Sequence, residues 1–328
     1  DDGSRIIART VSAGRRPFSA GEISEMSAVI SPATGARYGV ERVCGAWEQP
    51  RSTYYAQVAR AAHPVAPTPG QKRGPKTAIT DEVLLAAIRQ AITDSPFKDE
   101  GYRKVWAWLR YGPLHLRVGH NRVLRLMRQH QLLSPHRQRQ GAPETHDRTI
   151  TTDAPNVMWG TDGTQVRTVE DGLVWIFSAV EHWNGECVGM YVCKRGTRFN
   201  AVQPVLEGVQ TLFGSVTRGV AQGLAVRLDH GSANCSEHFQ GELTRLGITP
   251  SFSFVEEPQT NGVVERFNRT LKEQAIYGRV FRTLDEVREA VLSFRQDYNR
   301  SWRLEKLGFM TPREARQRYA ERSRLVAA

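Results

Sequence analysis

Cysteine is scarce in this chain of 328 residues, and the few that occur form no pattern. None belongs to a Cys-x-x-Cys pair, and the nine histidines lack the spacing of zinc ligands. This argues against a disulfide framework and fits a reducing compartment. The cysteines are Cys44, Cys187, Cys193 and Cys235.

Long apolar runs are also missing. The longest, Leu173 to Val180, has the length of a strand and falls far short of the ~18 residues that cross a bilayer. We therefore expect no membrane-spanning segment, and we find no pattern of a secretory signal peptide.

Acidic residues are too few to balance the basic ones. The chain has 45 Lys and Arg against 34 Asp and Glu, which gives a formal net charge of +11. Such a surplus favours an acidic partner, most often nucleic acid, although a protein with a merely basic face remains the alternative. Hydrophobic residues make up 40%, which excludes a wholly disordered chain, and the length allows two domains or more.

The first 62 residues divide into a tail and a helical pair. Residues 1–25 are polar and rich in serine, glycine and arginine, so we expect a disordered tail. Across residues 26–62 apolar side chains recur at helical spacing, and Pro50 suits the first turn of a second helix. Two short helices with a tight turn predict a helix-turn-helix in which Arg51 and Tyr54 contact DNA. An ordinary helical hairpin is the alternative.

Residues 63–77 are dense in proline and glycine and predict a linker. Its basic residues predict a strap that follows DNA phosphates or enters a minor groove. A linker that is merely solvated is the alternative. The basic residues are Lys72, Arg73 and Lys76.

Residues 78–135 predict a second, helical DNA-binding domain. Thr80 is the expected N-cap of its first helix, whose apolar stripe runs from Val83 to Ile92. Asn121 is the expected N-cap of the last helix, whose arginines we expect to face DNA. Those arginines are Arg122, Arg125 and Arg128.

Most of the positive surplus lies in this part of the chain. Residues 98–148 hold eleven basic and four acidic residues, and a solvated basic face is the alternative to a DNA-binding one. Residues 136–155 are polar, contain two prolines and predict another linker.

From residue 156 the pattern changes to strands. Three sequential strands predict an antiparallel meander, the second over Leu173–Val180 and the third over Gly189–Cys193. Four helices and strands follow, near residues 201–213, 224–228, 237–246 and 248–252, and a long helix is expected from 263 to 275. The order is that of an α/β fold with a mixed sheet, predicted for residues 156–278 and followed by a helical extension over 279–328.

Three carboxylates fall at the expected ends of these elements. Asp162 is expected to end the first strand and Asp229 the fourth, at the sheet rim where α/β active sites gather. Glu265 falls in the first turn of the late helix. Three oxygen ligands suit magnesium or manganese, and two such ions support phosphodiester chemistry. Taken singly, each acid would more often be a cap or an ion-pair partner, so the hypothesis depends on the set.

Several motifs resemble those of DNA-recombining enzymes. The segment from Pro258 to Lys272 resembles the catalytic-glutamate block of the retroviral-integrase-like DDE transposases, and 35 residues separate Asp229 from Glu265 as in that family. Residues 228–232 and 159–164 resemble the two aspartate blocks. Further segments resemble the B-frame transposases of the bacterial insertion-sequence-three family: Gly101–Leu133, Arg51–Tyr55, Tyr298-Asn299, Leu307-Gly308 and Thr311-Pro312.

The chain also departs from this family. Between Tyr298-Asn299 and Leu307-Gly308 the family commonly carries Arg-Pro-His, whereas this chain has Trp302-Arg303-Leu304. What that triplet does here is left open. Pro50 stands where a serine is usual, and no histidine–cysteine zinc module precedes the core.

The resemblance implies an RNase H-like mixed-sheet catalytic core preceded by small helix-turn-helix segments. Asp162, Asp229 and Glu265 would be the catalytic residues and would bind two Mg²⁺ ions, with Mn²⁺ as a substitute. The enzyme would be a DDE transposase, a polynucleotidyl transferase that cuts DNA at insertion-element ends and joins the freed 3′-hydroxyl to another strand.

The resemblance also implies partners. These are double-stranded DNA with terminal inverted repeats, target DNA, further copies of the chain, and a helix-turn-helix and leucine-zipper protein from an upstream frame. The expected place is the nucleoid in the bacterial cytoplasm. Two other classes stay open: an RNase H-like nuclease or resolvase that cuts without joining, and a non-catalytic DNA-binding regulator.

The helix that begins near Glu265 supplies further candidates. Arg269 and Lys272 follow at four and seven residues, share its face and are expected to hold DNA phosphates. Asn261 and Asn268 are counted with the DNA contacts. A conformational role is the alternative for Asn261, and a packing role for Asn268.

Overall fold

The computed structural model describes residues 18–62, 78–134, 152–252 and 262–327. The chain forms two compact units, residues 1–77 and 78–328. Each is described by itself. In the described residues, no helix combines the length and the apolar character that crossing a membrane requires.

The first unit contains three helices, α2 (Ala20–Ala28), α3 (Gly39–Ala46) and α4 (Arg51–Ala62). α2 begins inside the predicted tail, so that prediction is wrong from residue 18 onward. Ser19 and Glu22 form a reciprocal capping box, which starts the helix. Phe18 stacks on Trp47 with 4.0 Å between the ring centroids, and this contact fixes the segment before the helix.

The second unit begins with α5 (Asp81–Asp94), α6 (Tyr102–Tyr111) and α7 (His120–Gln129). Thr80 caps α5 as predicted, and its side chain accepts from the backbone N–H of Val83. The apolar stripe of α5 agrees with the prediction only in part: Val83 is exposed, whereas Ala91 is buried. The predicted cap of α7 is wrong: the N-cap is Gly119, and Asn121 lies within the first turn.

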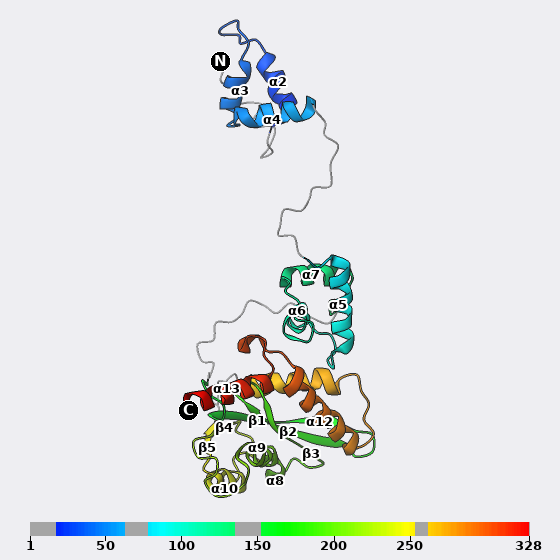
Figure 1. Cartoon of the computed structure of the whole chain (residues 1–328), viewed down its shortest axis with the longest axis vertical. Helices are drawn as coiled ribbons and strands as arrows, with labels where there is room; N and C mark the ends of the chain where they lie inside the picture. Colours follow the sequence, from blue (N-terminus) through cyan, green and yellow to red (C-terminus); the bar gives the residue numbers. More distant parts are fainter. Residues whose placement is uncertain (1–17, 63–77, 135–151, 253–261, 328) are drawn as a thin grey trace. The chain divides into compact units, whose positions relative to one another are not determined.

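A five-stranded sheet forms the centre of this unit (Figure 1). Its spatial order is β3-β2-β1-β4-β5, with β1 to β3 antiparallel and β4 and β5 parallel to β1. The strands are β1 (Met158–Arg167), β2 (Leu173–Glu181), β3 (Cys187–Cys193), β4 (Ala225–Leu228) and β5 (Thr249–Phe252). This is the RNase H-like mixed sheet that the sequence predicts.

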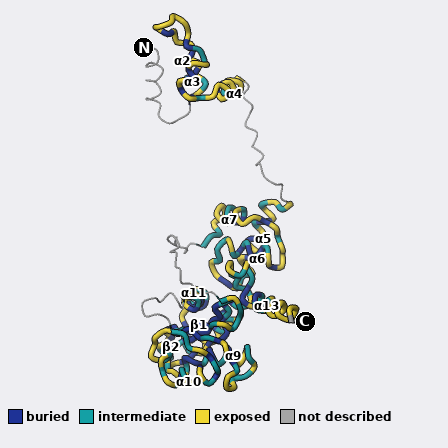
Figure 2. Tube along the Cα trace, turned by 90° about the vertical axis from the view of Figure 1, so that its left-hand side faces the viewer, coloured by how far each residue is buried: buried dark blue, intermediate teal, exposed yellow. Residues whose placement is uncertain are grey.

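Helices cover both faces of the sheet, and the tube is mostly buried along β1 and β2 (Figure 2). Each face has its own apolar cluster. On one face Trp159 and Phe239 lie in the cluster that includes α9 and α10, and on the other Phe267 and Phe294 lie in the cluster that includes α11 and α12. The helices are α8 (Arg198–Ala201), α9 (Gln203–Phe213), α10 (Glu237–Leu246), α11 (Gly262–Leu271) with its π-helical continuation η2 (Lys272–Ile276), and α12 (Leu284–Ser301).

The C-terminal helices belong to the same packed unit. Val287, Val291 and Tyr298 of α12 are buried in the cluster that also holds α11. The domain boundary predicted at residue 278 therefore falls inside this unit, because α12 supplies the apolar cover that β2 and β3 require on this face. The short 3-10 helix η3 (Glu305–Leu307) and α13 (Pro312–Ala327) follow.

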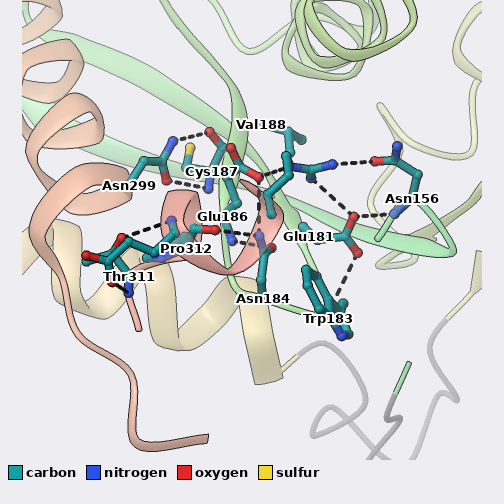
Figure 3. A network of polar contacts seen from close by, with 12 residues as sticks. Asn156, Glu181, Trp183, Asn184, Glu186, Cys187, Val188, Asn299, Thr311 and Pro312 are labelled. Atoms are coloured by element: carbon teal, nitrogen blue, oxygen red, sulfur yellow. Dashed lines mark hydrogen bonds and ion pairs between the residues drawn. The ribbon is translucent and has the colours of Figure 1, made fainter. Parts of the chain in front are cut away.

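Polar contacts tie this C-terminal part to the β2–β3 hairpin (Figure 3). The Asn299 amide exchanges two hydrogen bonds of 2.9 Å with the backbone of Cys187, and Asn184 donates to the Pro312 carbonyl at 2.9 Å. Glu181 is fully buried and accepts from the backbone N–H of Asn156 at 2.6 Å. In this chain the Tyr-Asn and Thr-Pro motifs thus stabilise the packing of the C-terminal part against the β2–β3 hairpin.

Candidate active site

Asp162 lies on the sheet face that α11 covers. The sequence places it at a strand end, but β1 continues to Arg167 because β2 pairs with it along that whole length. The parallel partner β4 is shorter: its last pair with β1 joins Arg227 to Gly160. Asp162 is therefore inside β1 and just beyond the edge of β4, which leaves room beside its side chain.

Asp229 follows β4 directly, as predicted. The β1–β4 register pairs Gly160 with Arg227, so two further residues along each strand bring Asp162 beside Asp229. The Asp229 carboxylate accepts from the backbone N–H of Gly231 at 2.9 Å and from the Asn234 amide at 2.6 Å. These two donors hold it at the sheet rim. A side chain at Gly231 would put Cβ 2.9 Å from the same oxygen, so this tight turn needs glycine.

A buried amide orients Asp162. Asn268 in α11 donates from Nδ2 to Asp162 Oδ2 at 2.9 Å, and the backbone N–H of Gly163 donates to Oδ1 at 2.7 Å. The Ser178 hydroxyl donates to Asn268 Oδ1 at 2.9 Å, which fixes the amide with its N–H groups towards the carboxylate. Asn268 is buried, which favours the packing role that was its alternative over the predicted DNA contact.

Glu265 lies in the first turn of α11, as predicted, and is exposed. Although Glu265 is exposed as a whole, partial desolvation of its carboxyl group raises the pKa most, and the nearby charge of Asp162 raises it further. Burial also raises the pKa of Asp162, with Asp229 adding to the effect while Asn268 and Lys272 oppose it. Asp162 is thus close enough to Asp229 and to Glu265 for its charge to be repelled by the one and to repel the other.

This donor set fits a hard divalent cation. Carboxylate oxygens are the ligands that magnesium and manganese prefer, and a cation between them would relieve the mutual repulsion that raises both pKa values. Among the residues that the structure describes, no group of three or more acidic, histidine or cysteine side chains is arranged so that it could hold a metal ion.

The other predicted site residues differ in their burial and in their contacts. Tyr54 is a core residue of the first unit, with its hydroxyl 2.9 Å from Ser24 Oγ, so it does not face DNA. Arg51 is exposed and pairs with Glu41 at 3.2 Å. Arg269 is exposed, and Lys272 is half-buried near enough to lower the pKa of Asp162. The predictions on Lys72, Arg73, Lys76 and Asn261 lie outside the described residues.

The arginines of α7 do not all face outward. Arg122 and Arg125 both pair with Asp81, at 2.7 and 2.6 Å, and hold its pKa below the ordinary range. They brace α7 against the first turn of α5, so neither is a free cation in this structure, and their contact with DNA stays a prediction. Arg128 is exposed.

Sequence reasoning missed Ser178 and Asn234. Both are small polar residues whose importance comes from the carboxyl or amide that the fold places beside them. Asn234 lies five residues after Asp229 in an Asp-x-Gly turn, which is a weak signal; Ser178 carries none, because it reaches the site from another strand.

Comparison with known proteins now identifies the class. Residues 246–312 match the integrase core domain family, and residues 79–140 match the HTH-like domain family. With the RNase H-like sheet and its carboxylates, these matches define a transposase with an integrase core.

The relatives give the particular kind. The chain is 28% identical over 294 residues to the transposase for insertion sequence element IS629 of Shigella sonnei, covering 86% of this chain and 93% of the relative. It is 28% identical over 150 residues to the transposase InsF for insertion sequence IS3A of Escherichia coli, covering 45% and 49% of the two chains. The chain is thus similar to transposases of bacterial insertion sequences, among them one of an IS3 element.

Solved structures were compared as well. The catalytic core domain of BIV integrase is 22% identical with a TM-score of 0.36, and the match covers 53% of this chain and 99% of that one.

Proposed function

We propose that Asp162, Asp229 and Glu265 are the catalytic carboxylates of this DDE transposase. The observation that carries the proposal is the β1–β4 register: continued by two residues, it brings the two aspartates together. Asp162 in turn raises the pKa of Glu265 from another element, α11. Three acids from separate parts of the chain thus share one electrostatic site.

The same residues would hold two magnesium ions, with manganese as a substitute. When bound, such ions activate an attacking hydroxyl and stabilise the leaving oxygen of a phosphodiester. The chain's own contribution is orientation. Asn268 aims the Asp162 carboxylate, and Gly231 and Asn234 hold that of Asp229.

The substrate of the proposed site is double-stranded DNA at the ends of an insertion element. Water would cut one strand and free a 3′-hydroxyl, which would then attack a second phosphodiester without a covalent enzyme intermediate. Lys272 and Arg269 would hold phosphates beside the carboxylates, since both follow Glu265 on the same helical rod. Arg128 would add a contact from α7.

The partners form the rest of the proposal. Two element ends must be held together for joining, so the active form is a multimer of this chain on DNA. A helix-turn-helix and leucine-zipper protein from an upstream frame would assist it, and the work would be done at the bacterial nucleoid.

The test uses a labelled duplex that carries the element's own terminal repeat. The full chain is incubated with magnesium, with manganese or with EDTA, beside the Glu265→Gln variant. Glu273→Gln is the matched control, because Glu273 is an exposed glutamate of the helical continuation η2. We expect metal-dependent nicking and joined products from the parent and from Glu273→Gln, and neither product from Glu265→Gln.

Other outcomes would select the other classes. Nicking without joined products, even with the upstream-frame protein present, would favour a nuclease or resolvase. Specific binding with no metal-dependent chemistry would favour a DNA-binding regulator.

A further inference from the structure

The helices α5 to α7 are attached to the core through Trp302. The Lys104 ammonium of α6 lies over the face of the Trp302 indole. Phe97, in the loop between α5 and α6, meets the same indole edge-on with 4.7 Å between ring centroids. Phe97 is 7% exposed and belongs to the core's apolar cluster, although it lies outside the core in sequence. We call Trp302, Lys104 and Phe97 the indole socket.

A second attachment joins the same loop to the catalytic helix. The backbone N–H of Lys98 donates to Gln274 Oε1 at 2.8 Å, and Gln274 Nε2 donates to the Lys98 carbonyl at 3.0 Å. Gln274 is in η2, which continues α11 without a break. The continuous helix of α11 and η2 carries Glu265 in its first turn. Its other end is therefore hydrogen-bonded, through Gln274, to the segment that contains α5 to α7. π-helical turns are rare and are frequent at functional sites.

Further contacts surround these two. The Arg303 guanidinium donates to the Tyr111 carbonyl at 3.3 Å, and Trp106 meets Phe309 with 5.2 Å between ring centroids. Arg103 pairs with Glu305 at 3.0 Å, but both side chains are exposed, so this pair adds little. Attachments at separate places resist rotation as well as displacement, because turning about one of them breaks another.

The attachment gives a role to the triplet in which this chain departs from its family. Trp302 and Arg303 stand where Arg-Pro-His is common, and both contact the helical segment. The contacts between the helical segment and the core therefore depend on residues at which this chain differs from the common family pattern.

We propose that the indole socket and the Gln274 bridge act as a ruler for DNA cleavage. Resting on the function proposed above, the inference is that they hold the HTH-like segment at a fixed distance from the carboxylates. The position of the cut is then set by where that segment binds the element end. Successive base pairs are about 3.4 Å apart along the helix axis of the duplex, so a shift of that size along the axis between segment and core moves the cut by one position.

Trp302, Lys104 and Gln274 are positioning residues in this inference. The test variant combines Lys104→Ala with Gln274→Ala, which removes the cation from the indole socket and both hydrogen bonds of Gln274, and leaves the Trp302 indole in its contacts with Phe97 and Tyr298. Glu273→Ala is the matched control, since it truncates the neighbouring side chain on η2. Lys104→Arg is the conservative variant that keeps a cation over the indole.

The first measurement needs neither DNA nor activity. Spin labels are attached to Cys235 and to an Arg89→Cys substitution on α5. Cys235 is the exposed one of the four cysteines, and Arg89 is exposed on the same unit. We expect one narrow distance distribution in the parent, in Glu273→Ala and in Lys104→Arg. The double variant should broaden it by about 3 Å or more, the spacing of one base step. A distribution as narrow as the parent's would overturn the proposal.

The second measurement maps the cut on the labelled terminal-repeat duplex. The parent and both control variants should cut at one main phosphodiester, whereas the double variant should spread its cuts over the neighbouring ones. If the double variant keeps the single position although its distances broaden, the ruler is wrong. A parent that shows no metal-dependent nicking contradicts the proposed function, while the distance measurement still decides whether the attachments fix the segment.

Discussion

Replacing Asn268 by alanine tests the positioning of Asp162 directly. The buried Asn268 amide donates to Asp162 and accepts from Ser178. A hydrogen bond to a charged group contributes about 1.5–3 kcal/mol, and a buried hydroxyl left without its partner costs about 1–3 kcal/mol. Asn268→Ala should therefore lower the free energy of unfolding by about 3 kcal/mol or more. Urea unfolding of the metal-free protein measures this loss.

The same change should also move the pH dependence of nicking. The bond from Asn268 lowers the pKa of Asp162, so its loss raises that pKa further above the ordinary range. The carboxylate then ionises at higher pH, and the acidic limb of the rate profile shifts upward. Ser178→Ala keeps the bond to Asp162 and should shift the limb less. Thr270→Val, on the same helix, should leave it in place.

Two results would refute this reasoning. An acidic limb that stays put in Asn268→Ala, in a protein that is still folded, would show that the amide does not control the protonation of Asp162. A loss of unfolding free energy no larger than that of Thr270→Val would show that the buried hydrogen bonds contribute little.

Four further outcomes are expected. Partial burial and the charge of Asp162 raise the pKa of Glu265, so its ionised form opposes folding at neutral pH. Magnesium should therefore raise the Tm at pH 7, and this increase should become smaller as the pH falls through the pKa of Glu265. Glu265→Gln should reduce the increase in Tm. Gly231→Ala should weaken this magnesium response in a titration followed by Tm, because its Cβ would displace the Asp229 carboxylate. Glu181→Ala should lower the free energy of unfolding by about 2–3 kcal/mol in urea, because the backbone N–H of Asn156 and the buried indole N–H of Trp159 lose the carboxylate that accepts from them. Tyr54→Phe should lower the stability of the first unit by about 0.5–1.5 kcal/mol without weakening DNA binding, which a gel-shift titration would check.

Local pattern was enough for the strands and helices of the core and for the antiparallel meander within a mixed sheet. β2 begins at Leu173 and α10 at Glu237, as the sequence predicts, because the signals of these elements act within a few residues. Pattern failed where packing overrides it. Arg122 and Arg125 look like a free basic stripe, but Asp81, some 41 residues earlier in the chain, captures both.

The sequence alone determined which groups are available for catalysis: three carboxylates, their spacing, and a late helix that begins near one of them. It also carried the resemblance to the insertion-sequence transposases, because those motifs are local. Only the tertiary structure decided which groups orient the carboxylates. Ser178 and Asn268 are 90 residues apart, and their roles arise because sheet pairing and helix packing bring them to Asp162. The attachment of Trp302 to Phe97 and Lys104 has the same origin, since burying an indole needs partners that the neighbouring sequence does not supply.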